Sequence, residues 1–333
     1  MNKKATIYEV AKKAKVSLAT VSRVLNNNKN VSIKTATKVK KAIKELNYIP
    51  NALARNLATN KGYQIALIVP EVSFSFISRV ISGVVDVGLK NNYNVVLYST
   101  NYGKDSVNKI INSIIESRID GVIIINSEIN TQAMAKLSKN DIPLTIIGTP
   151  VKGKIRSSVS VNYEKITYEV IRKYLQNNYY KIIFIDGEYN RFVATQILSG
   201  IKQAFLEDNT YFDGYLQVDE SYSQSYLQIY DYLKHNKVDL IIGARDSLAI
   251  AALNAALDLN IVIAEDLDII GYNNTKYSRM ARPALSTIEV PKYDLGAKAA
   301  MQMVKMLRKE EIVVQNEVLD TYFVRRNSSK IEV

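Results

Sequence analysis

The chain contains no cysteine and a single histidine, His235. The lack of cysteine excludes disulfides, thiolate metal sites and cysteine nucleophiles, and any Ser-His-Asp triad would have to use this one histidine. His235 lies in the polar stretch YLKHNKVD, which follows a predicted helix and is typical of a solvated surface position. We therefore expect neither a metal site nor a cofactor.

Long hydrophobic runs and enzyme motifs are also missing. No stretch approaches the roughly 20 consecutive apolar residues that a membrane-spanning helix needs. The first residues, MNKKATIYEVAKKAK, lack the apolar centre and the small-residue cleavage site of a secretory signal. The sequence has no GxGxxG, GxxxxGK[ST] or GxSxG motif and no paired carboxylates in a motif context. These absences predict a cytoplasmic protein that is not an enzyme and has no membrane partner.

The charge of the chain is unevenly distributed. The net charge at pH 7 is +12, and residues 1–62 hold 14 lysines and arginines against two acids, Glu9 and Glu45. The other residues hold 30 charges of each sign. A basic module joined to a neutral body is typical of a nucleic-acid-binding protein. A disordered basic tail is the alternative, but it would not require regular apolar spacing.

That spacing predicts three short helices in the basic segment. Thr6 and Glu9 have the spacing of a capping box. In it, the Thr6 hydroxyl accepts a hydrogen bond from one unpaired backbone N–H, and the Glu9 carboxylate reaches back to accept one from another. Ser17 and Ser32 can cap the second and third helices. The inward positions recur at helical spacing: Ile7, Val10, Ala11 and Ala14, then Val21, Val24 and Leu25, then Ile33, Ala36, Val39, Ile43 and Leu46. Three such helices around one small core make a helix-turn-helix unit.

The second predicted helix has small or hydrogen-bonding side chains on its outward face. A helix of this kind can lie deep in a DNA major groove and contact base edges. Lysines on the flanking helices suit phosphates, which position the protein without specifying a sequence. The outward residues are Leu18, Ala19, Thr20, Ser22 and Arg23.

Three runs of sequence resemble the lactose-repressor/galactose-repressor (LacI-GalR) family: TIYEVA from Thr6, VSLATVSRVLN from Val16, and LNYIPNALARNLA from Leu46. The resemblance extends through the rest of the chain nearly to its end. One departure is Lys15, where many members carry glycine, and a side chain there costs stability if φ is positive. The resemblance implies that bases are read by Leu18, Ala19, Ser22 and Arg23, and that the DNA backbone is contacted by Thr6, Tyr8, Ser17, Thr20 and Asn30.

The resemblance also implies a hinge helix from Pro50 to Ala58 that contacts DNA through Asn51, Ala54, Arg55 and Leu57. Asn51 can cap a helix of only about two turns, which is marginal in water, so DNA is expected to stabilise it. Leu57 has no evident local core and can wedge between base steps in the minor groove. The alternative is a plain linker with Leu57 packed on the core.

From Tyr63 onward, short apolar runs alternate with longer amphipathic stretches. Continuous apolar strands between helices indicate parallel sheets covered on both faces. The spacing breaks near 157–162, where one doubly wound lobe ends and a second begins. The predicted strands are 65–69, 95–98, 122–125, 144–147, 182–185, 240–242 and 267–270. The predicted fold class is thus α/β: a helix-turn-helix headpiece and hinge helix, followed by a two-lobed, periplasmic-binding-protein-like core.

The resemblance divides the chain into a helix-turn-helix domain, 1–49, a hinge and linker, 50–62, and a core, 63–333. Lobe one would hold about 63–161 and 291–321, and lobe two about 162–290 and 322–333. The core is expected to form a homodimer that pairs two half-sites of a pseudo-palindromic DNA operator, and to sense a signal. A secreted solute-binding protein shares the two-lobed architecture, but the basic headpiece and the missing signal sequence argue against it.

The cleft between the lobes is expected to bind effectors, because ligands in such folds lie at the carboxyl ends of strands. Sugar-binding family members resemble one another in an arginine of an RxxG segment and in an aspartate after a strand-ending GF or GY. Here Ile197 and Asn273 occupy those positions, so we do not expect a sugar effector. Asp246 matches the family's ND motif, although helix capping explains it about as well.

The cleft resembles that of catabolite-control members of the family, which also lack these charged sugar anchors. Those members instead bind a serine-phosphorylated phosphocarrier protein, HPr, on lobe one. Tyr293 and Asp294 match that contact segment, and Lys305 matches a basic contact one helix further on. This similarity makes HPr a candidate corepressor.

Two arginines of that contact are replaced here, by Met301 and, in our alignment, by Tyr322. Without a bidentate arginine, a phosphate loses much of its recognition energy, although Lys298 could supply a point charge. Three hypotheses for the signal therefore stay open: HPr, an unidentified small effector, and binding without an effector.

Overall fold

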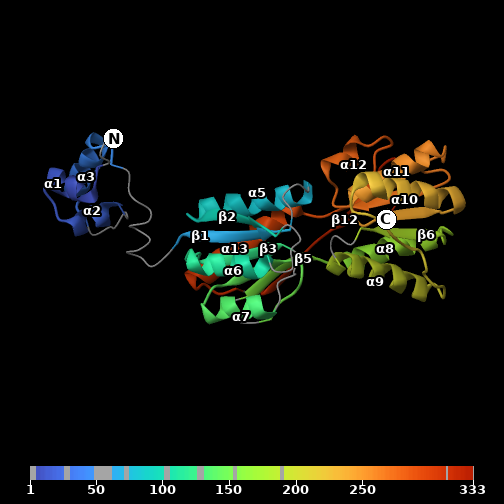
Figure 1. The fold of residues 1–333 in the computed structure, drawn as a ribbon, viewed down its shortest axis with the longest axis horizontal. Helices are drawn as coiled ribbons and strands as arrows, with labels where there is room; N and C mark the ends of the chain where they lie inside the picture. Colours follow the sequence, from blue (N-terminus) through green and yellow to red (C-terminus); the bar gives the residue numbers. More distant parts are fainter. Residues whose placement is uncertain are drawn as a thin grey trace. The chain divides into compact units, whose positions relative to one another are not determined.

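The computed structural model describes residues 5–25, 31–48, 62–70, 75–100, 106–125, 131–152, 156–187, 191–312 and 314–332. The chain forms two compact units, Met1–Gly62 and Tyr63–Val333 (Figure 1). Among the described helices, none combines the length and the apolar character needed to cross a membrane.

The first unit is the predicted three-helix headpiece, made of α1 (Ile7–Ala14), α2 (Leu18–Leu25) and α3 (Ile33–Glu45). Val10, Val21 and Val39 are fully buried at its centre. The prediction for Ile33 is wrong, since this side chain is 86% exposed. Ile33 is the first residue of α3, and the buried residues of that helix lie in its later turns.

Lobe one of the second unit is built on a parallel sheet with strand order β11-β5-β4-β3-β1-β2. Its strands are β1 (Gln64–Val69), β2 (Asn94–Ser99), β3 (Gly121–Ile125), β4 (Leu144–Ile147), β5 (Arg156–Val161) and β11 (Asn316–Leu319). Alternate residues of β1 enter different cores: Ile65 and Leu67 pack with α5 (Ser75–Lys90) and α13 (Lys292–Arg308), and Ala66 and Ile68 with α6 (Ser106–Glu116) and α7 (Thr131–Lys139). Burial on both faces explains the continuous apolar run in this strand.

Lobe two repeats the design with strand order β12-β10-β9-β8-β6-β7. Its strands are β6 (Ile182–Asp186), β7 (Tyr215–Gln217), β8 (Leu240–Gly243), β9 (Asp268–Tyr272), β10 (Ser286–Glu289) and the antiparallel β12 (Tyr322–Val324). The helices α8 (Tyr163–Leu175) and α9 (Arg191–Glu207) pack together, as do α10 (Tyr222–His235) and α11 (Asp246–Asp258), and the short α12 is Lys276–Met280. The predicted α/β fold with two parallel-sheet lobes is confirmed.

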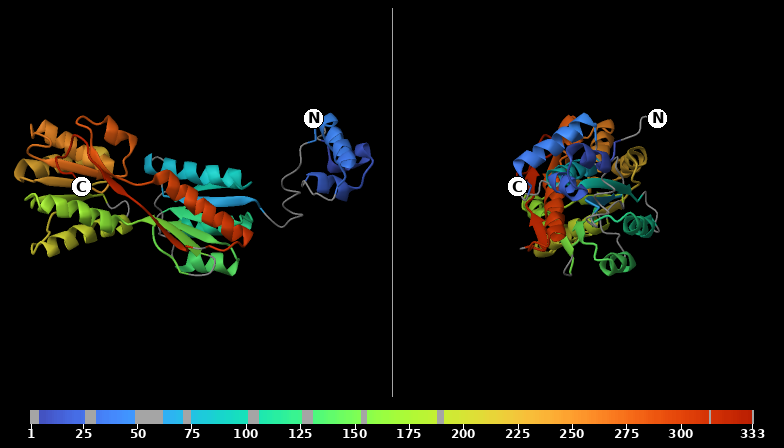
Figure 2. Two further views of the ribbon diagram at one scale, coloured as in Figure 1. Left: turned by 180° about the vertical axis from the view of Figure 1, so that it is seen from behind. Right: turned by 90° about the vertical axis from the view of Figure 1, so that its left-hand side faces the viewer.

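The chain passes between the lobes three times: from β5 to α8, from β10 to α13, and from β11 to β12. Helix α13 thereby lies against α5 in lobe one, although the two helices are more than 200 residues apart in the sequence (Figure 2). They cross at two glycines. A Cβ atom on Gly83 would lie 2.1 Å from the carbonyl oxygen of Tyr293, and one on Gly296 would lie 2.1 Å from that of Val80.

We therefore expect Gly83→Ala to lower the free energy of unfolding of the core by about 1–3 kcal/mol or more. The added methyl group would clash with the backbone of α13, which would have to shift. Thermal or denaturant unfolding of the full chain measures the effect. Ser78→Ala on the exposed part of α5 is the control and should change stability by less than about 0.5 kcal/mol. Equal stability of the two variants would contradict the close crossing.

Candidate nucleic-acid interface and regulatory surfaces

Helix α2 turns one face to its core and the other to solvent. Val21 and Val24 are buried against the other two helices. The exposed side chains are Leu18, Ala19, Ser22 and Arg23, whereas Thr20 is half-buried. The four exposed residues are spaced at i, i+1, i+4 and i+5 and therefore share one side of the helix. A helix with such an exposed side can lie in a major groove and contact base edges.

The ends of α1 and α2 are held by the predicted caps. The Glu9 carboxylate accepts a hydrogen bond from the Thr6 backbone N–H at 2.7 Å, and the Thr6 hydroxyl accepts one from the Glu9 N–H at 3.4 Å. The Ser17 hydroxyl accepts a bond from the Thr20 N–H at 3.2 Å and lies 2.9 Å from the Thr20 hydroxyl. Tyr8 is exposed beside the first cap. The caps hold the first turns of α1 and α2.

Both acids of the first unit are engaged within it. Glu9 belongs to the capping box, and the Glu45 carboxylate lies 2.8 Å from the Lys13 ammonium. A hydrogen bond and the charge of Lys13 hold the pKa of Glu45 below its usual range. The exposed cations of the described part of this unit are Lys12, Lys13, Lys15, Arg23, Lys34, Lys38, Lys40, Lys41 and Lys44. This surface suits a polyanion.

Five predicted DNA contacts lie outside the described residues, so their assignment stays a prediction. They are Asn30, Asn51, Ala54, Arg55 and Leu57.

A pocket of about 300 Å³ lies at the carboxyl ends of the strands in both lobes of the core. Phe76 and Gly148 line it from lobe one, and Asp186, Arg245 and Asn273 from lobe two. Sequence reasoning missed Asp186 and Arg245. Each closely follows an apolar strand run, β6 or β8, and that position at the carboxyl end of a parallel strand was the signal that could have found them.

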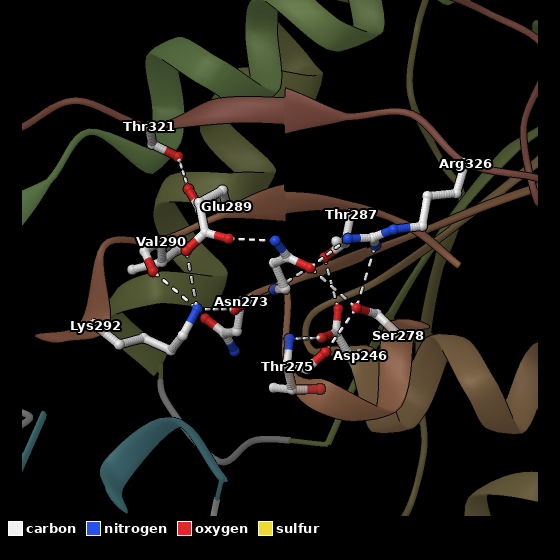
Figure 3. Close-up of polar contacts among 11 residues, drawn as sticks. Asp246, Asn273, Thr275, Ser278, Thr287, Glu289, Val290, Lys292, Thr321 and Arg326 are labelled. Carbon is white, nitrogen blue, oxygen red and sulfur yellow. Dashed lines mark hydrogen bonds and ion pairs between the residues drawn. The ribbon is translucent and has the colours of Figure 1, made fainter. Parts of the chain in front are cut away.

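Asp246 lines the pocket, but protein groups satisfy its buried carboxylate. One oxygen accepts a bond from the Thr275 backbone N–H at 2.5 Å and the other from the Thr287 hydroxyl at 2.6 Å (Figure 3). Burial raises the pKa of Asp246. Asp246 is not the N-cap of α11, because the N-cap is Arg245. Through its bonds to Thr287 and Thr275, Asp246 instead ties α11 to β10 and to the start of α12.

Ile197 and Asn273 stand at the two positions where the family resemblance would place charged sugar anchors, and they lie in different parts of lobe two. Ile197 is fully buried in the apolar core around α8 and α9. Asn273 lines the pocket with a φ of 92°, and its carbonyl oxygen accepts a hydrogen bond from the Lys292 ammonium. That ammonium also donates to the Val290 carbonyl at 3.0 Å and lies 3.1 Å from a Glu289 carboxylate oxygen. Lys292 thus ties the loop at Asn273 to the β10–α13 crossover (Figure 3).

The predicted corepressor contacts lie on α13. Asp294, Lys298, Met301 and Lys305 are spaced by four, three and four residues and form one stripe along the helix. Tyr293 flanks this stripe and donates a hydrogen bond at 3.0 Å to an Asp86 carboxylate oxygen on α5. The stripe is therefore a continuous helical surface on lobe one.

The sequence also singled out Tyr322 and His235. Tyr322 is exposed on β12, in the sheet of lobe two. His235 is the last residue of α10 and has an exposed side chain, as expected for a surface histidine.

Comparisons with known proteins agree with these features. The lacI family of bacterial regulatory proteins matches residues 6–51, and the periplasmic binding protein-like domain matches residues 171–329. Catabolite control protein A of Staphylococcus xylosus is 31% identical over 98% of this chain and 99% of its own length. The Staphylococcus epidermidis protein of that name is 31% identical over 94% of this chain and 96% of its own length.

Solved structures show the same fold. The lac repressor dimer bound to operator and the anti-inducer ONPF has a TM-score of 0.87 at 23% identity, covering 98% of this chain and 99% of its own. The transcription regulator CcpA of Lactococcus lactis has a TM-score of 0.72 at 24% identity, covering 80% of this chain and 99% of its own. The chain belongs to the lacI family of bacterial regulatory proteins, and it is a DNA-binding transcriptional regulator.

Lys15, in the turn between α1 and α2, has a φ of 54°, where a side chain is unfavourable. We expect Lys15→Gly to stabilise the headpiece by about 0.5–1 kcal/mol. Amide hydrogen exchange of α1 and α2 in the full chain measures this. Lys12→Gly, inside α1, is the control and should destabilise by about 1 kcal/mol. If both variants exchange faster than the original protein, strain at Lys15 is unimportant.

Proposed function

We propose that the protein is a catabolite-control-type repressor that binds a pseudo-palindromic operator as a homodimer in the cytoplasm. The observation that carries this proposal is the exposed side of α2, where Leu18, Ala19, Ser22 and Arg23 stand on a unit whose acids are engaged internally. Each headpiece would read one half-site, and two-fold symmetry would pair the half-sites.

The roles of individual residues follow from their chemistry. The Arg23 guanidinium suits a guanine edge, and Ala19 and Leu18 suit a thymine methyl group. The exposed Thr6, Tyr8 and Ser17 and the half-buried Thr20 at the caps suit the DNA backbone, which holds the helix in register. The hinge residues Asn51, Ala54, Arg55 and Leu57 would contact the minor groove at the centre of the operator.

We expect Arg23→Ala to weaken operator binding by about 1–3 kcal/mol and to relax the preference at one base position of each half-site. Lys4→Ala, just before α1 in the sequence, is the control and should weaken binding to all sequences about equally. Selection of bound fragments from a randomised library, followed by affinity measurements, separates the effects. An unchanged base preference in Arg23→Ala would show that Arg23 does not read a base.

An exposed aromatic surface on lobe two supports the proposed homodimer. Tyr222 and Tyr226 of α10 stack with their ring centroids 6.4 Å apart and, with Leu257 of α11, line a hollow of about 330 Å³. Asn254 donates a hydrogen bond to the Tyr222 hydroxyl at 2.6 Å, which keeps this ring in place. A rigid aromatic surface is typical of the centre of a protein interface.

Leu257 is 40% exposed, and Leu257→Asp would place a charge in this interface without disturbing the core. We expect the variant to sediment as a monomer and to lose operator affinity. Leu206→Asp on α9, where the side chain is 74% exposed, is the matched control and should stay dimeric. A dimeric Leu257→Asp protein would place the interface elsewhere.

A second proposal is that HPr acts as corepressor on α13. It is supported by the stripe of Asp294, Lys298, Met301 and Lys305, which continues the face beside Tyr293. Met301 is 41% exposed in the middle of the stripe, where a phosphoserine contact would call for arginine. The pocket between the lobes could instead take a small effector, which is the alternative signal.

Restoring the arginine tests this proposal. We expect Met301→Arg to raise the preference for serine-phosphorylated over unmodified HPr by about tenfold or more, because arginine bonds phosphate bidentately. The measurement is titration of the operator complex with both forms. Leu206→Arg is the control and should leave the preference unchanged. If the original protein and Met301→Arg both fail to bind HPr, this contact does not exist.

A further inference from the structure

The passage from β10 to α13 carries a lysine that is almost fully enclosed. Lys292, the first residue of α13, has a side chain that is 11% exposed, and that of Glu289 is 19% exposed. An ammonium group has three hydrogens to donate. Here they meet a Glu289 carboxylate oxygen at 3.1 Å and the carbonyl oxygens of Val290 and Asn273. Because little water reaches these bonds, they are weakly screened and hold the lysine in one place.

The loop that this lysine holds has an unfavourable backbone. Asn273 and Asn274 follow β9 with φ values of 92° and 41°, although neither is glycine. Such conformations persist only where surrounding groups hold them. The second carboxylate oxygen of Glu289 accepts a hydrogen bond from the Asn274 side-chain nitrogen, and the Arg326 guanidinium donates one to the Asn274 side-chain oxygen at 2.6 Å (Figure 3). Side chains from outside the loop therefore fix its shape.

A second passage between the lobes meets the first at Glu289. Thr321 lies between β11 of lobe one and β12 of lobe two. Its hydroxyl donates a hydrogen bond to the Glu289 carbonyl oxygen (Figure 3). Two of the three passages of the chain between the lobes are thus bonded to each other. A change of backbone direction at either passage would disturb the bonds that Glu289 makes.

Both ends of the β10–α13 passage are attached to well-packed parts of the core. On the side of lobe two, residues 286–288 of β10 pair with β9. On the side of lobe one, α13 crosses α5 at close range at Gly83 and Gly296. Only Val290 and Pro291 separate β10 from α13. Since packed elements move as units, a bend between the lobes on this passage has to be taken up by these two residues.

We propose that Glu289, Lys292 and Thr321 form an interlobe brace: together they fix the direction in which the chain leaves lobe two, and thereby the angle between the lobes. Asn273 lines the pocket between the lobes and is bonded by Lys292. A molecule that entered the pocket and contacted Asn273 would therefore act on the brace directly.

The angle between the lobes bears on DNA binding because of where the chain is attached. The headpiece precedes β1, which belongs to lobe one, whereas the proposed dimer surface around Leu257 lies on lobe two. In such a dimer, the interlobe angle contributes to the spacing of the two headpieces, and a matching half-site spacing is a geometric requirement of operator binding. This link to DNA rests on the proposed dimer surface, but the brace itself does not.

The test measures the distance between the lobes in the full-length protein. The chain has no cysteine, so Gln132→Cys on α7 of lobe one and Lys202→Cys on α9 of lobe two provide two labelling sites, both at exposed positions. Mixing labelled chains with an excess of unlabelled chains keeps most label pairs within one chain. Double electron–electron resonance of nitroxide labels then gives the distribution of interlobe distances, and we expect one narrow peak for the original protein.

The main variant combines Glu289→Gln with Lys292→Met, which removes both charges and leaves no unpaired buried charge. We expect the distance distribution to broaden or shift and operator affinity to fall by about fivefold or more. Thr321→Val removes only the bond between the two passages and should also broaden the distribution. This single variant decides the question if the double variant does not fold.

Lys165→Met combined with Glu169→Gln is the matched control. It removes an exposed Lys–Glu pair, 3.9 Å apart, on α8 and should leave the distances and the operator affinity unchanged. The brace is overturned if the folded variants keep the distance distribution of the original protein, even if they unfold at a lower temperature. The distance measurement needs no DNA, so changed distances support the brace whether or not operator binding is confirmed. Changed distances with unchanged operator affinity would overturn only the link to headpiece spacing.

Discussion

The confinement of excess positive charge to residues 1–62 is the constraint on which the rest of the protein depends. Phosphate attraction then acts on the headpiece alone, and the neutral core is left to other contacts. Within the headpiece, the capping box and the Lys13–Glu45 pair engage both acids internally, and the other exposed charged side chains of its described part are cationic. The small side chains on the exposed side of α2 let that surface approach the bases closely.

In the core, one helix leads from the crossover beside the pocket between the lobes to an exposed surface on lobe one. Helix α13 begins at the β10–α13 crossover, where Lys292 bonds both the loop at Asn273 and the crossover itself. It then crosses α5 at Gly83 and Gly296 and presents the stripe around Met301. One helix therefore contacts the crossover and the lobe-one core and carries the proposed partner surface.

The parts of the fold that the sequence predicts are those governed by local periodicity. The caps, the headpiece helices and the strands with continuous apolar runs follow from spacing alone. The sequence does not predict strand β5, because its serines interrupt the apolar pattern; in the structure, the buried Ser157 and Ser158 are hydrogen-bonded to Thr145 and Asn316. The Thr275 and Thr287 partners of Asp246 and the Glu317 partner of Lys298 likewise lie on other elements. The helical period predicts which α13 residues share one face. It cannot predict that β11, from near the end of the chain, lies beside that face.

The most direct test of this account measures operator affinity and stoichiometry over a range of salt concentrations. We predict two chains per operator and a linear fall of log affinity with log salt, with a slope of magnitude above about 5, because six or more phosphates would be neutralised per dimer. An affinity insensitive to salt, or a complex with one chain per operator, would contradict the assignment of DNA binding to paired basic headpieces.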